Sequence, residues 1–248
     1  MRDAFRFAGL LALSLFAGAL HAQATRVVRE GAAVVFTGRI DAASVALARD
    51  LLQQTGVTRL VITSGGGLVD AALDLAEAVH ARELDVEVPT ACMSSCANYV
   101  VPAARRKLLG RPGAVAWHGT MAHVMYLHAT GQGTWTDAEI ADARRLATRE
   151  AAFYARIGVD GFVGWFAKLP PYAIDEFYAL SPADMARFGI GEVAVREPGA
   201  PIANPLVEFV KVDWAALQSL RGSVRIDPTQ LSGRADGAAT GPPDATNR

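Results

Sequence analysis

Apolar residues come in short blocks through the middle of the chain, and polar or glycine-containing stretches separate them. Residues 59–63 form a continuous apolar run, as expected for a strand buried on both faces. The pattern predicts further strands over residues 32–40, 85–88, 114–117 and 192–195. It predicts helices over residues 42–54, 68–80, 96–104 and 137–157, with shorter ones over 158–169 and 172–180. Because strands and helices alternate, we expect a parallel α/β core.

Three predicted helices begin with capping signals. Asp41 is suited to cap the helix over residues 42–54. Thr136 and Glu139 have the spacing of a capping box. Ser181 stands before a proline, which is favoured at the first helical position. Residues 206–220 have an amphipathic pattern and are expected to form a helix that docks on the domain or on a neighbouring subunit.

The first 24 residues have the form of a secretory signal peptide. Arg2 and Arg6 precede an apolar run over residues 10–20, which is too short to span a bilayer as a helix. Ala22 and Ala24 then provide a small-x-small cleavage site. A short buried helix is the alternative interpretation. With a signal peptide, the mature protein is expected to be soluble and periplasmic or secreted.

The C-terminal end is poor in apolar residues. From residue 226 onward, Ile226 and Leu231 are the only large ones, and glycines and prolines interrupt the rest. Such a segment cannot bury enough surface to offset the entropy of ordering it. We therefore expect a signal peptide over residues 1–24, one domain over 25–222 and a disordered tail over 223–248.

Composition and charge narrow the function classes. Of 248 residues, 24 are basic and 25 acidic, and removal of residues 1–24 gives 22 − 24 = −2. This balance argues against a nucleic-acid partner. Two cysteines are too few for a four-cysteine zinc site. His118, His123 and His128 are spaced by five, which matches no metal motif, so neither a metal nor a cofactor is expected.

A triple glycine, residues 65–67, lies between a predicted strand and a predicted helix. Backbone N–H groups are accessible at such a turn, and the helix start adds partial positive charge. The turn is therefore suited to an anion. It lacks the lysine of a P-loop, and Asp70 stands where a dinucleotide-binding fingerprint has its third glycine. A simple tight turn is the alternative interpretation.

Two serines and a histidine follow at similar junctions. Ser94 and Ser95 stand between a turn and a helix, where either hydroxyl would lie near the positive helix end or act as the N-cap. His118 ends a predicted strand at the same edge of the sheet. Cys92 and Cys96 bracket the serines, and we expect buried thiols rather than a strained disulfide.

Three segments in this order resemble a known superfamily. They read VITSGGGLVDAALDLAEAV, CMSSCANYVVPAARRK and PGAVAWHG, and a later one reads YALSPADMARFGIGEV. Together they are similar to the superfamily of the Clp protease proteolytic subunit and crotonase, in particular to its exported branch. The resemblance covers roughly residues 34–195. It implies a ClpP/crotonase-like α/β spiral of repeated β-β-α units with a helical C-terminal part. Relatives assemble as rings or trimers, so a homo-oligomer is consistent with it.

The resemblance also implies a catalytic centre. Ser95 would be the nucleophile, with Ser94 as the alternative one step out of register. His118 would be the general base. The oxyanion hole would come from the backbone N–H of Gly66 or Gly67 and that of Cys96.

The third catalytic residue departs from the pattern. The family aspartate corresponds to Phe177, which cannot orient a histidine through a hydrogen bond. Glu176 is the nearest substitute, Asp175 is the next, and the absence of any such residue is the third alternative. A displaced carboxylate lowers the rate of such centres by about 10⁴.

These features favour an exported serine hydrolase that cleaves a peptide or a small ester. A non-catalytic protein that binds a peptide or carboxylate on the same fold is the main alternative, and the missing aspartate favours it. Acyl-CoA chemistry is disfavoured because an exported protein would rarely meet coenzyme A. A serine–lysine dyad is disfavoured because Lys107, Lys168 and Lys211 stand at no motif position.

Overall fold

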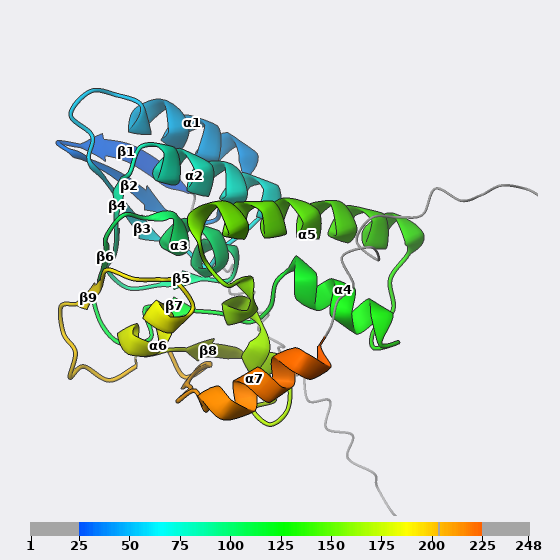
Figure 1. Ribbon diagram of the computed structural model, residues 1–248. Coiled ribbons are helices and arrows are strands. Elements are labelled where there is room, and N and C mark those ends of the chain that lie inside the picture. The colour runs from blue at the N-terminus through cyan, green and yellow to red at the C-terminus, as the bar shows by residue number, and fades with distance from the viewer. Residues whose placement is uncertain (1–24, 203, 225–248) are drawn as a thin grey trace, which may run out of the picture.

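The computed structural model describes residues 25–202 and 204–224, and its largest feature is a six-stranded sheet (Figure 1). The expected signal peptide and nearly all of the expected tail lie outside these residues. The strands run in the order β1-β2-β3-β4-β6-β9. They are β1 (Arg26–Glu30), β2 (Ala33–Thr37), β3 (Arg59–Thr63), β4 (Asp85–Val88), β6 (Lys107–Leu109) and β9 (Val193–Val195). Neighbours are parallel except for the β1–β2 hairpin, so a mixed α/β fold is confirmed.

In addition to the main sheet, two short two-stranded sheets form a second layer. β5 (Cys92–Met93) pairs in parallel with β7 (Val115–Ala116), and β8 (Phe177–Ala179) pairs in parallel with β10 (Val207–Phe209). Isolated bridges join Ser64 to Cys92 and Trp117 to Tyr178. The chain therefore passes twice from a main-sheet strand to a second-layer strand and then to a helix: β4, β5, η1 and β6, β7, α4.

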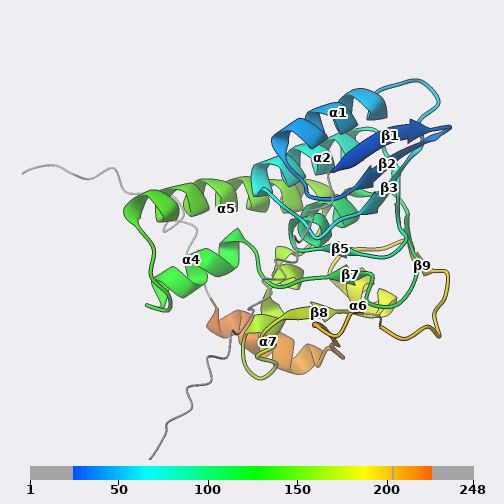
Figure 2. The same ribbon diagram turned by 180° about the vertical axis from the view of Figure 1, so that it is seen from behind.

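The helices cover the main sheet and extend beyond it. Both views show α1 and α2 side by side on the sheet, while the long α5 runs past its edge above α4 (Figures 1 and 2). Their bounds are α1 (Ala42–Leu52), α2 (Val69–Ala81), η1 (Cys96–Val100), α3 (Val101–Ala103), α4 (Met121–Ala129), α5 (Asp137–Ile157), η2 (Gly161–Gly164), η3 (Phe166–Lys168), α6 (Pro182–Arg187) and α7 (Trp214–Ser223). Among the residues described, no helix is both long enough and apolar enough to cross a membrane.

Ion pairs hold α5 against α2. Arg145 and Arg149 of α5 contact the Asp70 carboxylate at 2.6 and 2.9 Å, and Arg149 also contacts Asp74 at 2.6 Å. The hydrogen bond from Arg145 lowers the pKa of Asp70, and Arg149 adds to it. The carboxylate of Asp70 therefore holds α2 against α5 through ion pairs.

The local signals of the sequence are confirmed. Residues 59–63 and 85–88 form the predicted strands. Asp41 accepts a hydrogen bond from Ser44 N, and Thr136 forms the predicted capping box with Glu139. Ser181 caps α6.

Other elements differ from the prediction. The helix predicted over residues 172–180 is wrong, because its second half is β8, fixed by the pairing of Tyr178 with Trp117 and of β8 with β10. The helix predicted over 206–220 is wrong in its first part, which is β10. β1, β6 and α4 were not predicted. The C-terminal part accordingly mixes helices with strands.

Candidate active site

Ser94 lies in the turn between β5 and η1 and has φ +56°. Residues other than glycine rarely adopt this left-handed conformation, which costs about 1–2 kcal/mol. Two backbone hydrogen bonds hold the turn: Ser94 N donates to Ala116 O at 3.1 Å, and Asn98 N donates to Ser94 O at 2.8 Å. The result is a strained strand-to-helix turn, a conformation that other hydrolases use to expose a nucleophile.

His118 faces Ser94 across the second layer. Its Nε2 lies 2.8 Å from Ser94 Oγ, within hydrogen-bond distance. The parallel pairing of β5 with β7 explains why Ser94 and His118 meet. Met93 is in register with Ala116, so the residues that follow the two strands lie at the same end of the pair. The predicted junctions therefore do converge, with Ser94 as the serine that meets the histidine.

The imidazole of His118 is in a mixed environment. The ring packs on Phe177, with ring centroids 4.5 Å apart, while the residue as a whole is exposed. The loss of water on the packed side lowers the pKa of His118, and the positive charge of Lys168 lowers it further, while Glu176 opposes both. A neutral imidazole at neutral pH is the form that accepts a proton.

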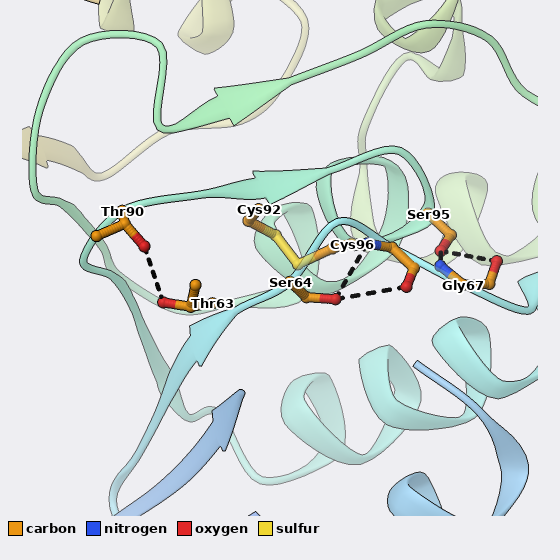
Figure 3. The surroundings of a disulfide bond; sticks show 8 residues. Thr63, Ser64, Gly67, Thr90, Cys92, Ser95 and Cys96 are labelled. Atoms are coloured by element: carbon orange, nitrogen blue, oxygen red, sulfur yellow. Dashed lines mark hydrogen bonds between the residues drawn. A yellow bond between two sulfur atoms is a disulfide. The ribbon is translucent and has the colours of Figure 1, made fainter. Parts of the chain in front are cut away.

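Ser95 is turned the other way. Its hydroxyl accepts a hydrogen bond from Gly67 N at 2.8 Å and lies 3.2 Å from Gly67 O (Figure 3). The side chain is 2% exposed. The structure therefore does not bring Ser95 to His118. Counting residues could not reveal this, because the positive φ of Ser94 decides which of the two hydroxyls faces the histidine.

The glycine turn lies against the serine turn. A Cβ on Gly66 would meet Met93 O and Ser94 Cβ, each at 2.8 Å, so glycine is required there. Gly66 N donates to Ser64 Oγ at 3.0 Å, and Gly67 N is bound by Ser95 (Figure 3). A substrate oxygen could use either amide only after the serine hydroxyl had moved.

Unlike the amides of Gly66 and Gly67, the backbone amides of Ser95 and Cys96 are not bound by any serine hydroxyl among the described residues. Within the residues described, neither amide donates a hydrogen bond to another group. They follow Ser94 directly at the start of η1, where backbone N–H groups point out of the helix end. Of the three expected oxyanion donors, Cys96 is therefore the one whose N–H remains available.

A disulfide joins Cys92 to Cys96, with Cα atoms 5.3 Å apart (Figure 3). The expectation of two buried thiols is therefore wrong. The turn at Ser94 brings the end of β5 back over the first residue of η1, which shortens the gap that residue spacing alone suggested. The bond ties together the two ends of the serine turn.

The expected third catalytic residue makes no contact of the required kind. In the described part of the chain, no carboxylate is hydrogen-bonded to His118. Asp175 and Glu176 instead offer their backbone carbonyls to Lys168 Nζ, at 2.5 and 3.2 Å. This clamp precedes Phe177 directly, so Lys168 holds the segment whose aromatic ring packs on the histidine.

Asn98 is a site residue that the sequence did not reveal. Its Nδ2 donates to the carbonyl of Gly119, next to His118, at 2.8 Å, and the side chain is 3% exposed. Its position four residues after Ser94, on the first turn of the following helix, is the sequence feature that could have indicated a place near the site. Asn98 therefore links the serine turn to the histidine loop.

Side chains of the types that bind metal ions are dispersed in the described part of the chain. Within the described ranges, no three His, Cys, Asp or Glu side chains gather as ligands would. His123 stacks on Trp165 with ring centroids 5.4 Å apart, and burial lowers the pKa of this histidine to about 4. His123 is thus a neutral packing residue beside the site.

Comparisons with known proteins give structural similarity only. No protein-family model matches the chain, and no curated protein matches it. Among solved structures, it is similar to an enoyl-CoA hydratase from Bacillus halodurans, with 8% identity, a TM-score of 0.39 and coverage of 84% of this chain and 83% of that one. It is also similar to DspI from Pseudomonas aeruginosa, with 14% identity, a TM-score of 0.40 and coverage of 85% and 78%.

Proposed function

We propose that this protein is a serine hydrolase that cleaves peptide or ester bonds, with Ser94 as nucleophile and His118 as general base. The observation that carries the proposal is the 2.8 Å contact between Ser94 Oγ and His118 Nε2. The strained turn at Ser94 supports it, because strain of this kind concentrates at functional sites. The repeated β-β-α order and the sequence resemblance favour a distant member of the Clp protease and crotonase superfamily.

The chemistry follows from this geometry. His118 takes the hydroxyl proton as Ser94 Oγ attacks the substrate carbonyl, and the negative charge develops on the carbonyl oxygen. The N–H groups of Ser95 and Cys96, which directly follow Ser94 in the chain, would donate hydrogen bonds to that charge. His118 then gives its proton to the leaving amine or alkoxide, and water hydrolyses the acyl-serine by the reverse sequence.

The centre is a dyad in which aromatic packing replaces a carboxylate. Phe177 fixes the imidazole plane at a ring-centroid distance of 4.5 Å but cannot select a tautomer or stabilise the imidazolium. Loss of that role lowers turnover by about 10⁴ in a known triad. We therefore expect slow turnover but measurable formation of a covalent serine adduct.

The test is covalent labelling of the purified protein with a fluorophosphonate, followed by mapping of the adduct by mass spectrometry. We expect the adduct on Ser94 in the wild-type protein and in Ser95→Ala, but not in Ser94→Ala. In His118→Ala the labelling rate should fall by about 10² or more. An adduct on Ser95, or none on a folded protein, would overturn the proposal.

A second candidate is a non-catalytic protein that binds a peptide or carboxylate at the same site. The absence of a carboxylate partner for His118 in the described part of the chain favours it. In that case the folded protein should bind peptides yet resist labelling, and Ser94→Ala should leave its affinity unchanged.

Export to the periplasm or beyond is part of the proposal. The apolar run and cleavage site in residues 1–24 support it. The disulfide of Cys92 and Cys96 is consistent with an oxidising compartment. Fractionation of cells that produce the full chain, with an N-terminal sequence of the exported form, tests both the export and the cleavage.

A further inference from the structure

Arg39 is a cationic side chain at the mouth of the candidate site that the proposed chemistry does not use. It lines a cavity of about 400 Å³ together with Ser94 and the three glycines of the turn, Gly65, Gly66 and Gly67. The side chain is exposed, and a Cβ added to Gly65 would meet nothing within 4 Å. The space beside Ser94 is therefore open, and among the described residues Arg39 is the one charged residue of its lining.

The backbone fixes Arg39 beside the glycine turn. Ile40, the next residue, donates its N–H to Gly66 O at 3.0 Å and accepts from Leu68 N at 2.9 Å. The carbonyl of Arg39 accepts from Thr25 Oγ1 at 3.1 Å. Arg39 thus stands on a backbone that is tied directly to the wall of the cavity.

Among the described residues, Arg39 makes no direct contact with a carboxylate. The nearby Asp41 carboxylate accepts from Ser44 N at 2.8 Å as the cap of α1. That hydrogen bond lowers the pKa of Asp41 and the charge of Arg39 contributes to the lowering, but the side chains of Arg39 and Asp41 form no ion pair. By contrast, Arg145 and Arg149 are both committed to aspartates on α2.

The surrounding backbone adds potential of the same sign. The 13-residue helix α2 begins at Val69, two residues after Gly67, so its positive end lies close in sequence to the glycines that line the cavity. Asp70, the acidic residue of its first turn, is paired with Arg145 and Arg149. A negative group in the cavity would be attracted by the positive charge of Arg39, and the described residues of the cavity lining include no carboxylate.

We propose that Arg39 binds a substrate carboxylate next to the scissile carbonyl, so that the site prefers anionic acyl compounds; this rests on the proposed function of Ser94. A guanidinium matches a carboxylate through two parallel hydrogen bonds, which positions the acyl group as well as attracting it. The carboxylate can be the free C-terminus of a peptide or the side chain of an Asp or Glu residue.

The first experiment compares three nitrophenyl esters of similar length, whose acyl groups end in a carboxylate, a methyl group or an ammonium group. The measured quantity is the ratio of kcat/KM for the anionic ester to that for the neutral one. We expect a ratio of about 10 in the wild-type protein, as for a charged hydrogen bond at a partly exposed site. In Arg39→Gln the ratio should fall to about 1.

A charge reversal guards against indirect effects. In Arg39→Glu the preference should invert toward the cationic ester, a gain that misfolding cannot produce. Arg82→Gln is the matched control, because Arg82 is also an exposed arginine, follows the C-terminal end of α2 and lies outside the cavity lining. This control should keep the wild-type ratio.

A second set of substrates distinguishes the two sources of carboxylate. Peptides with a free or amidated C-terminus are compared with peptides that carry Glu or Gln at one position. Dependence on the free C-terminus indicates carboxypeptidase-like use, and dependence on Glu indicates an acidic side chain. Either dependence supports the proposal if Arg39→Gln abolishes that dependence.

Failure of the proposed role of Arg39 can be distinguished from failure of the proposed hydrolase activity. If the wild-type protein is labelled at Ser94 but hydrolyses anionic and neutral esters equally, or if Arg39→Gln leaves the ratio unchanged, the role of Arg39 is overturned and the hydrolase stands. If a folded protein shows neither labelling nor hydrolysis, the hydrolase proposal is overturned and the role of Arg39 with it.

Discussion

At the scale of single residues, Ser94 combines an unfavourable backbone conformation with the position that faces His118. A left-handed φ of +56° is costly for serine and ordinary for glycine. We therefore predict that Ser94→Gly raises the free energy of unfolding by about 1 kcal/mol and abolishes fluorophosphonate labelling. Urea unfolding and labelling are the two measurements.

Ser94→Ala is the control for this prediction. It removes the same hydroxyl but keeps a Cβ, so labelling should be lost without the gain in stability. Equal stability of the glycine and alanine variants would show that the turn at Ser94 is not strained.

The pKa of His118 sets a second residue-scale prediction. Because partial desolvation and the charge of Lys168 lower that pKa, the neutral base predominates at pH 7. The labelling rate should fall as the pH drops through this lowered pKa, so the acid limb should lie below the ordinary histidine value of about 6.5. Removal of the positive charge in Lys168→Met should raise the pKa of His118 and move the acid limb to higher pH.

Lys211→Met is the matched control, since Lys211 is an exposed lysine that makes no contribution to the pKa of His118. The two profiles are measured with the same probe from pH 4 to 8. An acid limb of Lys168→Met that coincides with the control, or that moves to lower pH, contradicts the assignment.

At the scale of elements, Asn98 connects η1 to the loop that carries His118. Asn98→Ala removes the 2.8 Å hydrogen bond to Gly119 O and leaves that carbonyl without its partner. We expect a loss of about 1–3 kcal/mol in unfolding free energy and a labelling rate at least tenfold slower, because the histidine loop is no longer fixed.

Tyr154→Phe supplies the comparison for Asn98. It removes another buried hydrogen bond of η1, from Tyr154 Oη to Asn98 O at 2.9 Å, without touching the histidine loop. Its stability should fall by a similar amount while labelling stays near the wild-type rate. If both variants lose labelling equally, Asn98 acts only through stability.

The disulfide joins Cys92 of β5, two residues before Ser94, to Cys96, the first residue of η1. Closing so short a loop stabilises by about 2 kcal/mol on the chain-entropy model. A double variant, Cys92→Ser with Cys96→Ser, should lose about that much and label more slowly, because the Cys96 N–H is no longer held beside Ser94. Wild-type protein treated with a mild reductant should behave likewise, and unchanged labelling in both would refute the link.

The same elements show what sequence could predict. Caps and long periodic helices depend on neighbours within a few residues, so the caps of α1, α5 and α6 are all confirmed. β8 is three residues long and exists through its pairing with distant β10 and the bridge at Trp117, which no local pattern carries. The order of the glycine turn, serine turn and His118 was predictable, but the choice of Ser94 depends on a single backbone angle.

At the scale of the whole molecule, a buried carboxyl group joins three helices. Glu150 of α5 is 2% exposed and accepts hydrogen bonds from Tyr99 Oη of η1 at 3.1 Å and from Ala122 N of α4 at 3.0 Å. Burial raises its pKa to about 7, against an ordinary value of 4.5. The folded protein therefore holds this proton over a pH range in which the unfolded chain releases it.

The sign of the effect on stability follows from proton linkage. Between pH 4.5 and 7 the folded state binds more protons at this position than the unfolded state, so stability falls as the pH rises. The full loss is on the order of 3 kcal/mol above pH 7. Glu150→Gln keeps a neutral group that can donate to Tyr99 Oη and accept from Ala122 N, and it should escape the loss.

The measurement is urea unfolding of both proteins from pH 4 to 8.5. The two should be similarly stable near pH 4, and the difference should grow in favour of Glu150→Gln until it levels off above pH 7. Glu208→Gln, at an exposed glutamate of β10, controls for removal of a surface charge and should follow the wild-type curve. Parallel curves for the wild-type protein and Glu150→Gln would mean that Glu150 is ionised in the folded state at all these pH values, with Tyr99 and Ala122 stabilising the charge.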